Sequence, residues 1–328
     1  MRLAQALEQV MKDPVFQALD PRNRRFMEAR WLPLEMNPFT AYNIEVAALL
    51  LIGLPHIKTV AAFGMMMEDC RNGRYKDVHT IVVDSSGNTA HAVARLARAF
   101  GFHEVKVVLS ADVPESKKGI LAALSSVEII EVGAGKSVAH RAIEEARKPF
   151  HYHLNQYGHM GNVRAHEQFT GPEIVHALGY DISKIAVIAA AMGSGGTAAG
   201  IGRFFQDRNP KTIVVGVRPR PGEQVPGARN KKKMEEVVTL PWKESVDCVE
   251  EISRNESFER MRRLWSVVEP QPGPTSGLAW GGLEQLLLTY PPQKLALLDG
   301  KCVAFVCPDD GRFYSERTTG ELDTDQGL

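Results

Sequence analysis

The most informative segment of the chain is Thr80-Ile81-Val82-Val83-Asp84-Ser85-Ser86-Gly87-Asn88-Thr89. Its apolar half predicts a strand, and the apolar residues that follow Thr89 recur at helical spacing, so residues 85–89 form a loop between a strand and a helix. Backbone N–H groups and the positive end of a helix dipole converge at such a loop, which favours anion binding. Small polar residues are also ordinary helix caps. This first loop (residues 85–89) is therefore compatible with either role.

A second loop of the same kind lies further along the chain. Residues 185–191 predict a strand, residues 197–206 predict a helix, and between them stands Met192-Gly193-Ser194-Gly195-Gly196-Thr197. Glycines clear side chains from the loop, so backbone N–H groups and two hydroxyls can surround a phosphate. This glycine loop (residues 193–197) also fits Gly-x-Gly-x-x-Ala, and Arg218 follows the next strand, which is typical of an NADP-binding unit. Dinucleotide binding, another phosphate ligand and a structural turn all stay open at this point.

Short apolar runs alternate with helical patterns along most of the chain. This order predicts βαβ units with right-handed crossovers and a parallel sheet. The expected strands are residues 80–84, 104–109, 127–132, 185–191, 212–217 and 302–307. The expected helices are residues 89–100, 114–124, 136–146, 172–178 and 197–206. The sequence therefore predicts an α/β protein.

The composition favours small-molecule partners. A chain of 328 residues is long enough for about two domains. Lysine plus arginine equals aspartate plus glutamate at 39 each, so no overall field attracts nucleic acid or a membrane surface. The four cysteines are too scattered for a zinc ribbon, a redox pair or a disulfide framework, and we expect no metal site. With no signal peptide or membrane span apparent, we expect a cytoplasmic protein.

Two further segments have readable patterns. Leu3, Leu7, Val10 and Met11 predict an amphipathic helix at the amino terminus. The segment 218–229 is rich in proline and glycine and predicts an irregular surface loop, followed by a solvated lysine run at residues 231–233.

Several motifs, taken in order, resemble those of the fold-type-II pyridoxal 5'-phosphate enzymes, and among them the cysteine synthase and cystathionine β-synthase family. Lys58 stands where that family has its Schiff-base lysine, ahead of a Ser-Gly-Asn-Thr loop. The glycine loop is similar to the family's Gly-Thr-Gly-Gly-Thr phosphate loop. Residues 155–157, the Thr-Gly-Pro-Glu-Ile run at residues 170–174 and Gly-Pro-Thr-Ser-Gly at residues 273–277 also resemble family segments. The resemblance covers roughly residues 51–314.

The resemblance implies an architecture. We expect two doubly wound three-layer α/β domains with mostly parallel sheets, like the β-subunit of tryptophan synthase. Residues 47–153 would form a smaller, mobile domain that carries the first loop. Residues 1–46 and 154–328 would form the larger domain with the phosphate loop. Family members are commonly homodimers, so we expect a homodimer.

The resemblance also implies a site and a reaction. Lys58 would be the catalytic residue and carry the pyridoxal 5'-phosphate. The other expected cofactor contacts are Asn88, Gly193, Ser194, Gly195, Gly196, Thr197, Thr275 and Ser276, with Thr275 favoured over Ser276 at the pyridine nitrogen. The expected contacts with the substrate carboxylate are Ser85, Ser86, Gly87, Thr89 and Gln156. The expected reaction is β-replacement or β-elimination on a serine derivative (O-acetylserine, O-phosphoserine or serine), through an α-aminoacrylate.

The surroundings of Lys58 depart from the family pattern. Pro-His-Ile precedes the lysine where glycine or serine is usual, and Thr-Val follows in place of Asp-Arg. These departures leave open a degenerate member that binds the cofactor without turnover. Independently of Lys58, the glycine loop and Arg218 leave open an NADP-dependent oxidoreductase. His56, His91 and His159 could border the site, although a packed or solvent-facing role is the simpler expectation for each.

Overall fold

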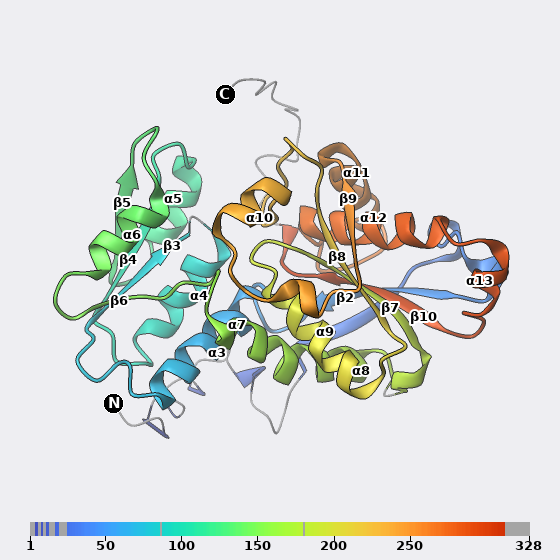
Figure 1. The fold of residues 1–328 in the computed structure, drawn as a ribbon, viewed down its shortest axis with the longest axis horizontal. Coiled ribbons are helices and arrows are strands. Elements are labelled where there is room, and N and C mark those ends of the chain that lie inside the picture. Colours follow the sequence, from blue (N-terminus) through green and yellow to red (C-terminus); the bar gives the residue numbers. More distant parts are fainter. Residues whose placement is uncertain are drawn as a thin grey trace.

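The computed structural model describes residues 25–85, 87–179 and 181–311, together with residues 4, 5, 8, 11, 12 and 17–19. Within this part, ten strands form two sheets that stand side by side (Figure 1). The six-stranded sheet has the order β1-β2-β10-β7-β8-β9, and the four-stranded sheet has the order β5-β4-β3-β6. All neighbouring strands are parallel except β1 and β2. The predicted α/β architecture with two mostly parallel sheets, like the tryptophan synthase β-subunit, is confirmed.

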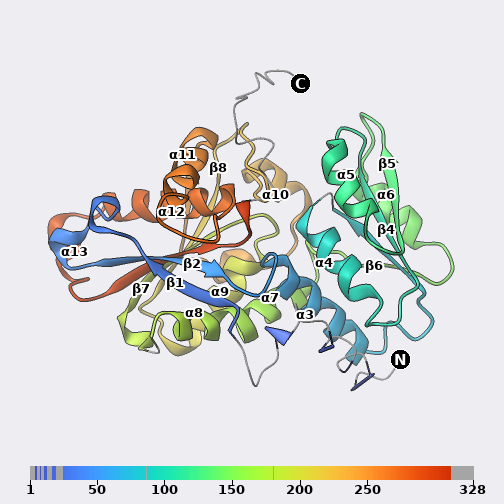
Figure 2. The ribbon, with the colours of Figure 1, turned by 180° about the vertical axis from the view of Figure 1, so that it is seen from behind.

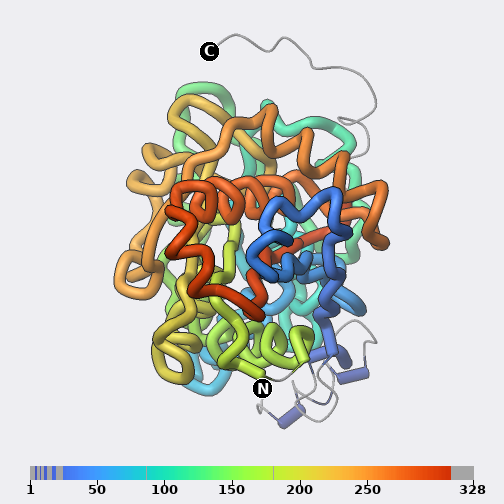
Figure 3. Tube along the Cα trace, turned by 90° about the vertical axis from the view of Figure 1, so that its right-hand side faces the viewer, coloured from blue at the N-terminus to red at the C-terminus, as the bar shows by residue number. Residues whose placement is uncertain are grey.

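The larger sheet lies between two helical layers. Its strands are β1 (Met27–Trp31), β2 (Glu45–Leu51), β7 (Ile185–Ala191), β8 (Ile213–Pro219), β9 (Cys248–Ile252) and β10 (Cys302–Cys307). One face of the sheet packs against α12 (Pro274–Leu288), with α11 (Arg254–Leu264) behind it, and the other packs against α9 (Gly196–Arg208). Figure 3 shows the orange helices above this layer and the yellow-green helices below it. Side chains alternate between the two cores because successive strand residues point to opposite faces.

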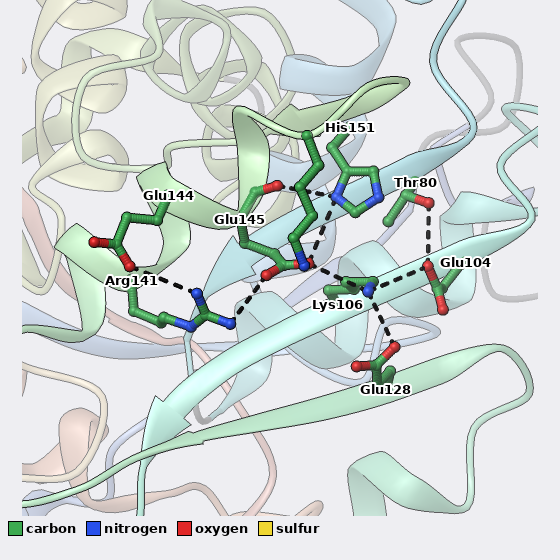
Figure 4. A network of polar contacts seen from close by, with 9 residues as sticks. Thr80, Glu104, Lys106, Glu128, Arg141, Glu144, Glu145 and His151 are labelled. Atoms are coloured by element: carbon green, nitrogen blue, oxygen red, sulfur yellow. Dashed lines mark hydrogen bonds and ion pairs between the residues drawn. The ribbon is translucent and has the colours of Figure 1, made fainter.

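The smaller sheet repeats this arrangement. Its strands are β3 (Thr80–Asp84), β4 (Glu104–Ser110), β5 (Val127–Val132) and β6 (His151–His153). On one face Val82 and Val108 pack against α6 (Val138–Ala146). On the other face Ile81 and Val107 pack in one core with α3 (Lys58–Arg71), α4 (Asn88–Ala97) and α5 (Glu115–Ala122). A charged network around Lys106 and Glu145 lies between β4 and α6 (Figure 4).

The remaining helices connect the two sheets or lie at the edges. Helix α7 (Met160–Ala165) packs on α3 between the two sheets, where both views of the ribbon place it (Figures 1 and 2). It continues through a π-helical turn, η3 (His166–Thr170), into α8 (Gly171–Ala177). Helices α10 (Lys231–Val237) and α13 (Pro292–Ala296) are short. Single helical turns occupy Leu34–Met36, Thr40–Tyr42, Ile182–Lys184 and Trp242–Glu244.

All six predicted strands are present, four of them with the predicted bounds, and the five predicted helices are present with ends shifted by one to three residues. The expected strands and helices did not include β1, β2, β6 and β9, or the helices α3, α7, α10, α11, α12 and α13. The lysine run at residues 231–233 is exposed, as expected, although it begins helix α10 rather than lying in a loop.

The division into two domains stays a prediction. The expected boundary at residue 47 falls inside β2, which belongs to the larger sheet, so we propose a boundary after Leu51 instead. Of the four residues that predicted the amino-terminal helix, Leu3, Leu7 and Val10 lie outside the described residues, as does the end of the family resemblance at residue 314. None of the helices in the described part is both long and apolar enough to cross a membrane.

Candidate active site

A cavity of about 680 Å³ opens where the carboxyl ends of the strands in both sheets meet. Ligands of open α/β sheets bind at this edge because loops there are free of the sheet's hydrogen bonding. Its wall contains the first loop, the glycine loop, the amino end of α3 and residues 223–230. The structure thus brings together segments that lie far apart in the sequence.

The glycine loop is built for close approach of a ligand to the backbone. A Cβ atom on Gly193 would lie 2.6 Å from the carbonyl oxygen of Gly227, and one on Gly196 would lie 2.2 Å from Oδ1 of Asn162. Gly195 has a φ of 80°, a backbone conformation that residues other than glycine rarely adopt. Helix α9 starts at Gly196, and Gly195 is its N-cap residue. Its unpaired N–H groups and dipole make the loop an anion-binding site.

Two hydroxyls of the loop are held in place by buried side chains. Ser194 Oγ accepts a hydrogen bond from Nδ2 of Asn162 at 3.1 Å. Thr197 Oγ1 lies 3.1 Å from Nε2 of His166. Burial and the nearby charge of Lys58 lower the pKa of His166 to about 3, so this histidine is neutral. Asn162 and His166 had no sequence signal; both come from the α7–η3 segment that packs under the loop.

Lys58 is the first residue of α3 and points at the glycine loop. Its Nζ donates to Ser194 Oγ at 3.4 Å. Burial first, and then the positive charge of Arg229, lower the pKa of Lys58 from 10.5 to about 8, against the opposing effect of Asp309. A substantial fraction of this amine is therefore unprotonated, and hence nucleophilic, near neutral pH.

The first loop lies across the cavity from the glycine loop. Ser85, Gly87 and Thr89 all line the cavity. The hydroxyl of Thr89 donates to Oε1 of Gln156 at 2.7 Å, so two residues predicted to bind the same carboxylate are in contact. Ser85 Oγ accepts from the backbone of Gly87 at 3.4 Å. Ser86 lies outside the described residues.

Asp309 was missed by the sequence analysis and lies between two predicted cofactor contacts. Its carboxylate accepts from Nδ2 of Asn88 at 2.8 Å and from Oγ1 of Thr275 at 3.5 Å. Thr275 lines the cavity, whereas Ser276 is fully buried and is not part of the cavity wall in the described residues. Thr275 is thus the better placed of the two hydroxyls. Asp309 follows the carboxyl end of β10. It could therefore have been identified as a site residue only from the order of the strands in the sheet.

After the end of β8, the segment 218–229 is an irregular and partly exposed loop, as expected, but it also forms part of the cavity wall. Val225 is buried, and residues 223–229 line the cavity because they follow the carboxyl end of β8. The guanidinium of Arg229 lies 4.6 Å from the ring centre of Tyr157 and donates to the phenol oxygen. This contact holds a positive charge inside the cavity.

The three histidines considered earlier divide between two places. His56 and His91 line the cavity, and Nε2 of His56 lies 3.0 Å from Nδ1 of His91. His159 instead pairs with buried Asp69 at 2.9 Å and caps α7. Its role is structural.

Arg218 does not support the dinucleotide alternative. Its guanidinium forms two contacts of 2.8 Å with Glu251 on the neighbouring strand, and the residue is not part of the cavity wall. A 2'-phosphate would have to compete with this ion pair.

The fold and the cavity define a two-sheet α/β protein in which a buried lysine faces a phosphate-type loop. A model of the family described as pyridoxal-phosphate dependent enzyme matches residues 57–300, which is most of the chain. The chain belongs to this family, and its cofactor is pyridoxal 5'-phosphate. This finding overturns the NADP alternative.

The proteins that are similar to this chain include a cysteine synthase and two solved structures. Over 274 residues the chain is 27% identical to cysteine synthase B of Escherichia coli (strain K12), covering 83% of this chain and 86% of the relative. Its fold resembles O-acetyl serine sulfhydrylase isoform 3 from Entamoeba histolytica, with a TM-score of 0.76, 19% identity, and 94% and 92% of the two chains covered. It also resembles the O-acetylserine dependent cystathionine β-synthase from Helicobacter pylori, with a TM-score of 0.75, 22% identity, and 92% and 96% covered.

The residues present fit this cofactor. The glycine loop leaves no room for side chains at Gly193 and Gly196, as a bound phosphate requires. Lys58 supplies an amine of lowered pKa beside that loop. Ser194 Oγ accepts from Lys58 and Asn162, so its own hydroxyl hydrogen can be donated to a phosphate.

Proposed function

We propose that the protein catalyses β-replacement or β-elimination on a serine derivative such as O-acetylserine, O-phosphoserine or serine. In the replacement reaction a sulfide, thiol or amine would take the place of the leaving group. The observation that carries the proposal is the position of Lys58, whose Nζ lies at Ser194 in a cavity also lined by the first loop. The similarity to cysteine synthases supports this choice of reaction.

The residues that would hold the cofactor come from both sheets. The glycine loop would bind the phosphate through backbone N–H groups and the hydroxyls of Ser194 and Thr197. Lys58 would carry the cofactor covalently. Asn88 would face the ring oxygen, and Thr275 would face the ring nitrogen, with the carboxylate of Asp309 orienting both side chains. When bound, the conjugated ring stabilises negative charge at the α-carbon of an amino acid.

The first loop would bind the substrate carboxylate. The backbone N–H groups at the start of α4, the side chain of Thr89 and the amide of Gln156 would surround that carboxylate, and Thr89 already contacts Gln156 at 2.7 Å. With the carboxylate held there, the amine of Lys58 would take the α-proton of the substrate. Arg229 supports this step because it helps to keep the pKa of Lys58 near 8.

Visible absorbance and product analysis test the proposal. The protein reconstituted with pyridoxal 5'-phosphate should absorb visible light, and Lys58→Ala should bind no covalently attached cofactor while keeping its fold. Incubation with each serine derivative and sulfide should then yield cysteine. The control is Lys233→Ala, which removes an exposed lysine at the cavity rim and should change neither result.

Two outcomes would contradict the proposal in different ways. A wild-type protein that stays colourless would show that Lys58 does not carry the cofactor. A coloured protein that exchanges no α-proton from any amino acid offered would instead favour the degenerate member, which binds the cofactor without turnover.

We also propose a homodimer, by analogy with the family, and closure of the smaller sheet over the substrate. Light scattering of the purified protein would give the oligomeric state. Protection of the first loop from hydrogen exchange on adding substrate would report closure.

A further inference from the structure

Helix α7 packs directly on α3, the helix that begins with Lys58 (Figures 1 and 2). A Cβ atom on Gly64 of α3 would lie 2.7 Å from the carbonyl oxygen of Gly161 in α7. A Cβ atom on Gly161 would lie 2.8 Å from Cα of Met65. The backbones of the two helices therefore touch where they cross, and the position of α7 depends closely on that of α3.

The other side of α7 touches the start of α9. A Cβ atom on Gly196 would lie 2.2 Å from Oδ1 of Asn162, and one on Gly200 would lie 2.4 Å from the carbonyl oxygen of Val163. Asn162 is fully buried and donates through Nδ2 to Oγ of Ser194 at 3.1 Å. Helix α7 thus lies in contact with both α3 and the glycine loop, and it fixes one relative to the other.

A polar contact fixes the amino end of α7. His159 is the N-cap residue, and its Nδ1 accepts a hydrogen bond from the backbone N–H of Gly161 at 2.9 Å. Its Nε2 lies 2.9 Å from Oδ1 of Asp69, which belongs to α3. Because Nδ1 is the acceptor, the ring hydrogen is on Nε2 and is donated to Asp69. A single tautomer of His159 therefore caps α7 and joins it to α3.

Asp69 is held from the side of the smaller sheet. Its side chain is fully buried, and its carboxylate also accepts from the guanidinium of Arg74 at 3.0 Å and from the hydroxyl of Tyr75 at 3.3 Å. Arg74 in turn donates to the hydroxyl of Tyr152 on β6 at 3.3 Å. These donors fix the orientation of the carboxylate, so Asp69 presents a fixed acceptor to His159.

We propose that Asp69 and His159 are positioning residues for the cofactor phosphate: their contact holds α7, and α7 holds the Ser194 hydroxyl toward the phosphate through Asn162. The backbone N–H of Asn162 donates to the carbonyl oxygen of His159 at 3.0 Å, so a shift of His159 moves Asn162 directly. Neither Asp69 nor His159 is part of the cavity wall in the described residues. This inference rests on the proposed binding of the phosphate by the glycine loop.

Two ligands separate this role from a general loss of structure. Pyridoxal has the ring and the aldehyde of the cofactor but no phosphate, so the wild-type apoprotein should bind pyridoxal 5'-phosphate much more tightly. In Asp69→Ala and His159→Ala the affinity for pyridoxal 5'-phosphate should fall by about tenfold, as expected for one hydrogen bond to a charged group. The affinity for pyridoxal should stay within about twofold, because Lys58 and the contacts of the ring do not change. Absorbance titration of the apoproteins measures both affinities.

Three more variants separate the contact from the cap and from the charge. Asp69→Asn keeps an oxygen that accepts from His159, and it should restore most of the affinity for pyridoxal 5'-phosphate. His159→Asn keeps a preferred N-cap residue on α7 but is too short to reach Asp69 as well, so it should lose as much affinity as His159→Ala. The matched control is Arg164→Gln. It breaks an ion pair with Glu68 between the same two helices, but this arginine is 47% exposed, so neither affinity should change.

Nitrogen-15 NMR of the apoprotein tests the arrangement without any cofactor. The ring of His159, assigned from its absence in His159→Asn, should show hydrogen on Nε2 and none on Nδ1. An Nδ1–H tautomer would overturn the proposal. An unchanged affinity for pyridoxal 5'-phosphate in His159→Asn would also overturn it, as would an equal loss for both ligands, even if Asp69→Ala failed to fold. A wild type that binds pyridoxal as tightly as pyridoxal 5'-phosphate would instead defeat the proposed phosphate site, and this inference would fall with it.

Discussion

The amine of Lys58 lies 3.4 Å from the hydroxyl of Ser194, although 136 positions separate the two residues in the sequence. The contact joins the start of α3 to the loop that starts α9, so Lys58 and the glycine loop both line the cavity. The charged side chains around this amine influence its pKa, and therefore its reactivity as a nucleophile.

Arg229→Gln and Asp309→Asn should shift the pKa of Lys58 in opposite directions. Burial lowers this pKa most, Arg229 lowers it further and Asp309 raises it. The three effects together leave the pKa at about 8. The rate at which the apoprotein captures pyridoxal 5'-phosphate covalently should rise with pH through that value. Its midpoint should move to higher pH in Arg229→Gln and to lower pH in Asp309→Asn. Lys233→Gln, which changes an exposed charge at the rim, should leave it in place.

The apoprotein should be less stable because of Lys58. The folded pKa of Lys58 is about 8 and its ordinary value is 10.5. Between these values the unfolded chain binds more protons, so the stability contributed by this group rises with pH across the window and is lowest below pH 8. Lys58→Met should therefore be more stable than the wild type at pH 7, by about 3 kcal/mol. Urea denaturation of both apoproteins at pH 7 and pH 10 measures the difference, which should shrink at the higher pH.

The two loops could be predicted from the sequence because each signal is local. A buried strand, small residues and a helix start fall within one short window in both cases, and the structure puts both loops on one cavity. Asp309 and Arg229 carry no comparable signal. They reach the cavity only because the carboxyl ends of β10 and β8 share an edge with β7, and the strand order is a property of the tertiary fold.

The missed elements have physical reasons of the same kind. Helix α12 is buried on nearly all sides, so its sequence shows no amphipathic period. Strand β2 is likewise a continuous apolar run in the centre of the fold. Strand β1 lies at an edge with a half-exposed polar pattern, and β6 has only three residues. Periodicity detects an element in which buried and exposed residues alternate regularly, whereas α12 and β2 are buried almost throughout, β1 shows no regular alternation and β6 is too short.

Gly196→Ala should weaken cofactor binding. The new Cβ would lie 2.2 Å from Oδ1 of Asn162, a fully buried side chain that also donates to Ser194 Oγ at 3.1 Å. Relief of the clash would displace both the Ser194 hydroxyl and the backbone of the glycine loop. We expect a loss of about tenfold or more in cofactor affinity, equivalent to about 1.4 kcal/mol. Fluorescence titration of the apoprotein with pyridoxal 5'-phosphate gives this affinity.

The control for that substitution is Gly119→Ala in helix α5. A Cβ there meets nothing within 4 Å, and alanine is the better helix former, so cofactor affinity should stay unchanged while stability rises by up to about 1 kcal/mol. Equal affinity in Gly196→Ala and the wild type would show that the cradle does not depend on close packing at this glycine.

Glu145→Gln should destabilise the smaller sheet without touching the site. The side chain of Glu145 is fully buried beneath β4, where it accepts from Lys148 at 2.6 Å and lies 3.2 Å from Lys106 (Figure 4).

Burial raises the pKa of Glu145, but the hydrogen bonds of the two lysines outweigh burial and lower it. The stabilising effect of Glu145 is therefore present at neutral pH and is lost as the pH falls through the folded pKa. Removing its charge takes the fully buried carboxylate away from Lys106 and Lys148, and we expect a loss of about 3 kcal/mol in the free energy of unfolding. Glu128→Gln is the matched control, because its side chain is 50% exposed at the same 3.2 Å from Lys106 and should cost less than about 1 kcal/mol. Equal losses in the two variants would mean that burial does not govern this network.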